Sequence, residues 1–189
     1  MLIFVILGAL LVGLLLYVIV IYNNLVALKN NVAKNWSNID VLLKQRNNEL
    51  PKLIDTCKQY MQYEKSTFEQ IVEARSVAVK AQADQDVAGV GQAESMLKMG
   101  LGKLFALAEQ YPDLKTNQSF QKLQTRISDL ENSISDRREL YNESVNLNNI
   151  RIQQFPDVIV AKTFNFASHT LLTFSEEERK DVDISSRFG

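Results

Sequence analysis

The beginning of the chain is apolar almost without interruption. Residues 2–21 include Gly8, Gly13 and Tyr17 but no charged side chain. An α-helix rises about 1.5 Å per residue, so about twenty apolar residues span the hydrocarbon core of a bilayer. A cleaved signal peptide is the competing interpretation, but no Lys or Arg precedes the run and no A-x-A-like cleavage site follows it. The sequence therefore predicts an uncleaved transmembrane anchor over residues 1–21.

Basic side chains flank this apolar run on one side only. None precedes it, whereas Lys29 and Lys34 follow it, with Lys44 and Arg46 further on. Cytoplasmic flanks of membrane helices carry an excess of Lys and Arg. We therefore expect the N-terminus outside and the C-terminal bulk of the chain in the cytoplasm.

The rest of the chain has the composition of a helical protein. Only 7 of 189 residues are glycine and 3 are proline, and few such residues interrupt helices. The 21 basic and 22 acidic side chains nearly cancel, which argues against nucleic acid as a partner. Cys57 is the only cysteine, so no intrachain disulfide can form.

The segment after the anchor carries one apolar stripe. Leu25, Val32 and Ile39 are seven residues apart, as on one face of a helix. Asn35 and Arg46 fall on or near this stripe. The first interpretation places them at its solvated edge. The alternative is a polar pair that fixes register within a bundle.

Three further helices are expected. The first proline, Pro51, follows a polar cluster, and proline in a helix interior costs about 3 kcal/mol. We therefore expect a turn there and a second helix over about 51–84, with a long kinked continuation of the first helix as the alternative. Apolar periodicity predicts a third helix over about 88–110 and a fourth over about 117–154.

The fourth helix has the clearest pattern. Its seam alternates steps of three and four residues, as in a coiled coil, through Phe120, Leu123, Ile127, Leu130, Ile134, Arg138, Tyr141, Val145, Asn148 and Ile152. Long helices with short connections favour an antiparallel up-and-down arrangement. The fold class expected is all-α: an N-terminal transmembrane helix followed by an antiparallel up-and-down four-helix bundle with long coiled-coil-like helices.

An ordered series of motifs resembles the LemA family. The first motifs are Tyr22-Asn23-x-Leu25-Val26, Trp36-x-x-Ile39-Asp40-Val41-x-Leu43-x-x-Arg46 and Leu50-Pro51-x-Leu53. Later motifs are Tyr63-Glu64, Ala74-Arg75-Ser76, Glu109-x-Tyr111-Pro112-Asp113-Leu114-Lys115, Phe120-x-x-Leu123-Gln124, Glu131-x-x-Ile134, Tyr141-Asn142-x-x-Val145, Asn149 and Phe155-Pro156. The resemblance spans about Tyr22 to Phe174. It implies a four-helix bundle and a cytoplasmic domain, but no settled molecular activity.

These observations divide the chain into four parts. Residues 1–21 form the transmembrane anchor, and residues 22–156 form the LemA-like four-helix bundle. Residues 157–174 are an apolar segment that lies near the membrane or contacts another subunit. Residues 175–189 are rich in charge and are expected to be a flexible tail. Candidate membrane or oligomer contacts are Ala9, Gly13, Tyr17, Tyr22, Phe155, Phe164, Phe166 and Phe174.

No catalytic motif is recognisable. The only histidine, His169, has Phe166 and not a glutamate three residues before it, so the E-x-x-H pattern of di-iron bundles is missing. Cys57 lies on an apolar stripe and is interpreted as a core residue. The remaining functional candidates are polar residues on or beside packing faces: Glu64, Arg75, Glu131, Arg138, Asn142 and Asn149. Their first interpretation is structural, fixing register within the bundle, and a ligand site is the alternative.

The function expected is non-enzymatic. The chain would be a self-assembling scaffold or interaction platform at the bacterial inner membrane. Its partners would be the lipid bilayer, further copies of itself and possible membrane proteins, and no cofactor or metal is expected. The alternative is a signalling or regulatory module that binds a peptide or small ligand between helices. A cavity lined by Glu64 and Arg75 would support this alternative. The missing ligand set argues against a metal-dependent hydrolase.

Overall fold

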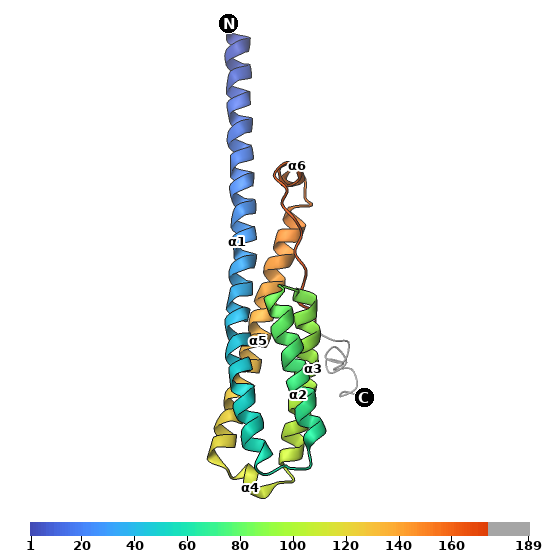
Figure 1. Cartoon of the computed structure of the whole chain (residues 1–189). Helices are drawn as coiled ribbons and strands as arrows, with labels where there is room; N and C mark the ends of the chain where they lie inside the picture. Colours follow the sequence, from blue (N-terminus) through green and yellow to red (C-terminus); the bar gives the residue numbers. More distant parts are fainter. Residues whose placement is uncertain (174–189) are drawn as a thin grey trace, which may run out of the picture. The chain divides into compact units, whose positions relative to one another are not determined.

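The computed structural model describes residues 1–173, and in this range every regular element is a helix (Figure 1). The helices are α1 (Leu2–Lys58), α2 (Lys65–Ala83), α3 (Val87–Ala108), α4 (Pro112–Lys115), α5 (Gln118–Arg151) and α6 (Asp157–Thr163). The predicted all-helical class is confirmed. Phe174 and the charged tail 175–189 lie outside the described residues.

The chain divides into two compact units. Within the described residues, the first unit comprises Met1–Ser37 and Glu139–Thr170, and the second comprises Asn38–Arg138 and residues 171–173. The long helices α1 and α5 each contribute residues to both units.

Helix α1 does not end at the first proline. It continues through Pro51 as one helix of 57 residues, so the predicted turn is wrong and the continuous alternative is right. Leu50 and Leu53 on either side of the proline are fully buried. Burying such side chains stabilises by about 1.5–3 kcal/mol each, which offsets the proline penalty of about 3 kcal/mol. The chain leaves the helical path at residues 59–64 instead, so the second helix begins at Lys65.

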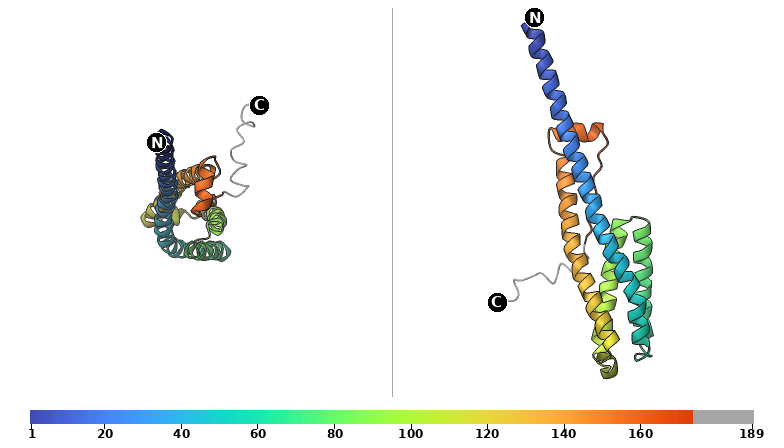
Figure 2. Two further views of the ribbon diagram at one scale, coloured as in Figure 1. Left: turned by 90° about the horizontal axis from the view of Figure 1, so that it is seen from above. Right: turned by 90° about the vertical axis from the view of Figure 1, so that its left-hand side faces the viewer.

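The second unit has a core to which α1, α2, α3, α4 and α5 all contribute. Its members include Leu53, Ile71, Leu101, Leu114 and Ile127, all at most 1 % exposed. Helices α2 and α3 lie side by side, joined by a short connection (Figure 2). The carboxylate of Asp86 in that connection accepts a hydrogen bond of 3.0 Å from the Gly89 amide and caps α3.

Gly100 of α3 lies close against Ile71 of α2. A Cβ atom at this position would come within 3.0 Å of the Ile71 side chain. Glycine weakens helices intrinsically, but here its missing side chain makes room for a buried neighbour. The periodic residues predicted for the third helix, Ala93, Leu97, Leu101, Leu104 and Ala108, are all buried.

The first unit is built from the beginning of α1, the end of α5, and α6. Its small core contains Ile21 and Leu25 of α1, Ile152, and Val160 and Ala161 of α6. Residues 2–20 of α1 are exposed except for the half-buried Val18, and Ile21 at the end of the apolar run is buried. Within the described residues, α1 is the one helix long and apolar enough to cross a membrane.

The segment after α6 returns along α5. The Tyr141 hydroxyl donates to the Thr170 carbonyl at 2.9 Å. Asn149 makes two bonds to the backbone of His169: its Nδ2 donates to the carbonyl at 2.8 Å, and its Oδ1 accepts from the amide at 2.9 Å. These polar side chains of α5 therefore hold an extended segment that has no helical hydrogen bonds of its own.

Candidate functional site

A buried ion pair joins α1 to α3 in the second unit. Arg46 Nη1 donates to Glu94 Oε2 at 2.7 Å, and Nη2 donates to Oε1 at 2.5 Å. The two side chains are 2 % and 5 % exposed. The first interpretation of Arg46, as a solvated edge residue, is therefore wrong. Two parallel N–H···O bonds fix both distance and orientation between the helices.

The ion pair forms one wall of a small polar cavity of about 140 Å³. The cavity is lined by residues of α1, α3 and α5: Arg46, Glu94, Lys98, Glu131, Asn132, Ile134, Ser135 and Arg138. Lys98, Asn132 and Ser135 are exposed, so the cavity reaches the surface. Pockets for drug-sized ligands usually measure about 300–1,000 Å³, so this cavity can take water, a small ion or only a few heavy atoms of an organic ligand.

The environment of Glu131 disfavours the charged form of its carboxyl group. Burial raises the pKa of its carboxyl, and the charge of Glu94 adds to this effect. The positive charges of Arg46, Lys98 and Arg138 oppose the increase without cancelling it. The buried Oε1 atom of Glu131 has no hydrogen-bond partner among the described residues. Ionised Glu131 is therefore held in the cluster at a net cost.

A second buried arrangement explains how α1 passes Pro51. Proline lacks the N–H that would bond to the carbonyl four residues earlier, which belongs to Asn47. That carbonyl instead accepts a bond of 2.9 Å from Nε of Arg75 in α2. Arg75 thus replaces the missing helical hydrogen bond and ties α2 to α1.

The predicted polar residues separate into four places. Glu131 and Arg138 line the charged cavity together. Arg75 lines a different pocket, and Glu64 lies just before α2, where its Oε1 is 3.5 Å from the Tyr111 hydroxyl. None of the cavities described in this section is lined by both Glu64 and Arg75.

The remaining two candidates, Asn142 and Asn149, belong to the first unit. Asn149 binds the backbone of the extended segment, as described above. Sequence reasoning missed Glu94, although a signal existed. Glu94 lies three and seven residues before Leu97 and Leu101, so the helical period places it on their buried face.

The predicted contact aromatics meet one another within the first unit. The Tyr22 ring lies edge-on to Phe164, with ring centroids 4.8 Å apart, and to Phe166 at 5.8 Å. Phe155, in contrast, is 82 % exposed. Tyr17, Ala9 and Gly13 are exposed on the apolar part of α1.

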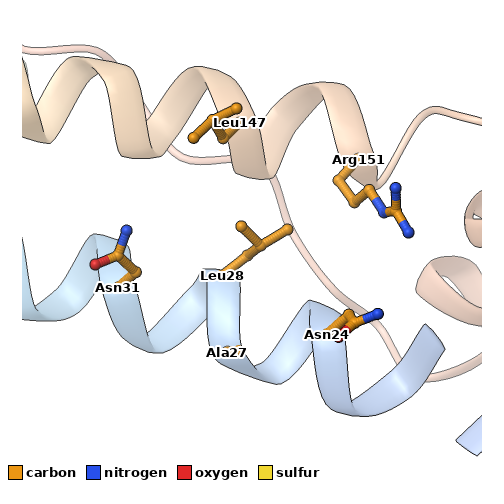
Figure 3. Close-up of a pocket in the computed structure, with 6 residues that line it drawn as sticks. All are labelled: Asn24, Ala27, Leu28, Asn31, Leu147 and Arg151. Carbon is orange, nitrogen blue, oxygen red and sulfur yellow. The ribbon is translucent and has the colours of Figure 1, made fainter. Parts of the chain in front are cut away.

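An open pocket of about 720 Å³ lies between α1 and α5 in the first unit. It is lined by Asn24, Ala27, Leu28, Asn31, Leu147 and Arg151. Leu28 points from α1 toward α5, and the polar side chains stand at the two ends (Figure 3). The pocket begins only a few residues beyond the end of the apolar run.

Cys57 is the only cysteine of the sequence, and its side chain is fully buried. Burial raises the pKa of the Cys57 thiol to about 12, so this cysteine stays protonated and packs as a core residue. No group of three or more His, Cys, Asp or Glu side chains in this range could hold a metal ion.

Comparison with known proteins places these features in a family. The model of the LemA family matches residues 35–185. The protein LemA of Metamycoplasma hominis is 29 % identical over 163 residues, which cover 86 % of this chain and 74 % of that protein.

Two magnetosome proteins are also similar. Magnetosome protein MamQ 2 of Paramagnetospirillum magneticum is 24 % identical over 160 residues, and MamQ of Magnetospirillum gryphiswaldense is 23 % identical over 160 residues. Each match covers 71 % of this chain and 58 % of the relative, so the chain spans less than two thirds of the length of these relatives. Because the family model covers most of the chain, the chain belongs to the LemA family.

Proposed function

We propose that this protein is a non-enzymatic scaffold that self-assembles in the bacterial inner membrane. Its apolar α1 segment is the anchor, and the polar helices form a platform beside the bilayer. Lys29 and Lys34 follow the apolar run, which supports an outside N-terminus and a cytoplasmic domain. The absence of a catalytic motif in the sequence supports a binding role over an enzymatic one.

The observation that carries self-assembly is the open pocket between α1 and α5. Its apolar centre, formed by Ala27, Leu28 and Leu147, begins just beyond the anchor. Copies that share a bilayer also share depth and orientation, so identical surfaces meet at the same height. Such confinement raises their effective concentration and favours even a modest contact surface.

We further propose that residues 22–156 form an antiparallel up-and-down four-helix bundle. The shared core of the second unit supports this arrangement, since four long helical segments contribute side chains to it. The close packing of α2 and α3, which a short connection joins, supports alternating helix directions.

The test is the mass of the full-length protein in native nanodiscs or mild detergent. We expect a defined oligomer for the natural chain and smaller species for Leu147→Glu, which places a charge in the open pocket. Leu140→Glu is the matched control, because Leu140 is similarly exposed on α5 but does not line the pocket. A natural chain that is strictly monomeric and crosslinks to nothing in membranes would contradict the proposal.

A regulatory module that binds a small ligand is the second candidate, and the charged cavity is the observation in its favour. Arg46 Nε is buried there without a hydrogen-bond partner in the described chain. The cavity of about 140 Å³ limits the ligand to a small ion or a few atoms of a larger molecule. Saturable stabilisation of the folded protein by small carboxylates or phosphate would favour this candidate.

A further inference from the structure

The turn and short helix after α5 present an exposed apolar surface. Phe155 is 82 % exposed, Ile159 58 % and Phe164 53 %. Phe155 stands in the turn before α6, Ile159 lies within α6, and Phe164 directly follows the helix. We call Phe155, Ile159 and Phe164 the apolar foot.

The opposite side of α6 fixes where this foot lies within the first unit. Val160 and Ala161 are buried against Ile21 and Leu25 of α1, with Val18 packed beside them. These α1 residues mark the end of the apolar run 2–21. Phe164 also contacts Tyr22, the first residue after that run.

The end of the apolar run is the level at which a membrane helix meets the lipid headgroups. Tyrosine and other aromatic rings are favoured at that level because one end is apolar and the other polar. Tyr17 and Tyr22 stand on α1 at this point, both at least partly exposed. The exposed Lys162 on α6 adds a positive charge that suits anionic headgroups.

We propose that the apolar foot is a second membrane contact, in which Phe155, Ile159 and Phe164 insert into the lipid headgroup region beside the α1 anchor. This inference rests on the proposed crossing of the membrane by α1. Its occupant is the lipid bilayer, because the foot is continuous with the surface of α1 that faces lipid.

The contact has a structural consequence. A single helix leaves the polar part of the protein free to tilt about the point where it exits the bilayer. A second contact, from a segment that follows α5, ties both α1 and α5 of the first unit to the membrane surface. The open pocket between α1 and α5 is then held at a constant height above the bilayer.

The test uses full-length protein in nanodiscs of phosphatidylcholine and phosphatidylglycerol, with a nitroxide spin label at one introduced cysteine. Cys57 is retained, because burial and a pKa of about 12 keep it from reacting at neutral pH. Unmodified protein treated with the reagent verifies this. Collision rates with oxygen, which concentrates in lipid, and with a water-soluble nickel chelate report the surroundings of each label.

Three positions separate the possible results. Val12→Cys lies in the apolar run, and Ile159→Cys lies in the foot. Leu140→Cys is a matched exposed apolar position on α5, and its carbonyl contacts Asn35, about 20 Å along α1 from the end of the run. We expect an oxygen-to-nickel collision ratio several-fold higher at residues 12 and 159 than at residue 140.

Each other outcome overturns a stated part of the proposal. A high oxygen-to-nickel collision ratio (a lipid signal) at residue 12 with a low ratio (a water signal) at residue 159 would contradict the membrane contact of the apolar foot. The proposed anchor would remain supported. Water signals at both positions contradict the anchor itself. A label at residue 159 that is shielded from both reagents and shows spin–spin broadening means that a second copy covers the foot, which also contradicts the proposal.

Discussion

The Arg46–Glu94 pair shows how one buried contact defines the second unit. Both charges have lost water, and their mutual attraction only partly offsets this cost. The pair fixes the position of α1 relative to α3, because the guanidinium and carboxylate planes meet in one orientation. A shifted register of α1 against α3 would leave two buried charges without partners.

Replacing one member of the pair is expected to destabilise the protein far more than replacing both. Arg46→Met or Glu94→Met leaves one buried charge and should lower the free energy of unfolding by about 3–5 kcal/mol. The double variant should recover most of this loss. Denaturant unfolding of the full-length protein in detergent, followed by circular dichroism, measures the difference.

The exposed pair of Lys44 and Asp40, with 2.6 Å between Nζ and Oδ2, is the control. Lys44→Met should cost less than about 1 kcal/mol, since surface ion pairs contribute little. Equal losses at the buried and exposed pairs would contradict the role given to Arg46 and Glu94.

Glu131 makes the stability of the second unit depend on pH. Its pKa is raised above the ordinary value of 4.5, mainly by burial. The folded state therefore binds the proton more tightly than the unfolded state. The free energy of unfolding declines as the pH rises from the ordinary pKa through the raised pKa of the folded state. Glu131→Gln should raise the free energy of unfolding near neutral pH, where the natural carboxyl is charged.

The stability that Glu131→Gln gains near neutral pH should vanish at acidic pH. Below the ordinary pKa the natural side chain is protonated in both states, so the variant has no advantage. Unfolding curves of both proteins across the pH range measure the difference. A gain that stays constant with pH would show that packing, and not ionisation, is responsible.

At the scale of elements, the continuity of α1 depends on a contact from another helix. Pro51 leaves the Asn47 carbonyl without its helical donor, and Arg75 supplies one from α2. The two residues should therefore be coupled in their effect on stability.

Arg75→Ala should cost about 1.5–3 kcal/mol in the natural chain, the usual value for a hydrogen bond to a charged group. In a Pro51→Ala background the helix provides its own N–H donor, so the same change should cost about 1 kcal/mol less. A double-mutant cycle of unfolding free energies measures this coupling.

Gln82→Ala serves as the control for the cycle. Its amide donates to the Asp40 carbonyl at 3.1 Å, which Pro51 does not affect. Its cost should be the same in both backgrounds. If Arg75→Ala also costs the same in both, the proposed replacement of the missing bond is wrong.

Most helices could be predicted from periodicity, because buried apolar residues follow the helical repeat closely. The fourth predicted helix, about 117–154, corresponds to α5, and nine of its ten seam residues are buried. The proline rule predicts the end of the first helix at Pro51, whereas α1 ends at Lys58. The rule fails here because it considers one residue at a time. The burial of Leu50 and Leu53 depends on α2 and α3, which a local rule does not include.

The charged cluster was predictable only in part. Glu131 and Arg138 can be identified as candidates because these polar residues fall on or beside the packing face of a helix. Arg46 was assigned to a solvated edge because buried arginine is rare, and Glu94 was overlooked. Each is buried only because the other is present, and such pairing across helices cannot be deduced from the spacing within one helix.

At the scale of the whole molecule, the apolar run of α1 and the charges that follow it are the basis for the proposed orientation of the protein in a membrane. Lys29 and Lys34 follow the run, whereas no Lys or Arg stands before it. By the positive-inside rule the second unit should face the cytoplasm. The proposed scaffold would then be reached by cytoplasmic proteins only.

This orientation predicts which cysteines a membrane-impermeant maleimide can reach in intact spheroplasts. Val72→Cys lies on α2, where the natural side chain is 49 % exposed, and should be labelled only after the membrane is opened. Leu2→Cys, at the 75 % exposed beginning of α1, should be labelled without opening it. The natural chain supplies the negative control, because its Cys57 is buried and should remain unlabelled in both conditions. Labelling of residue 72 in intact spheroplasts, with residue 2 protected, would mean the opposite orientation. The charges after α1 would then be outweighed by another determinant, and extracytoplasmic partners would have to be sought.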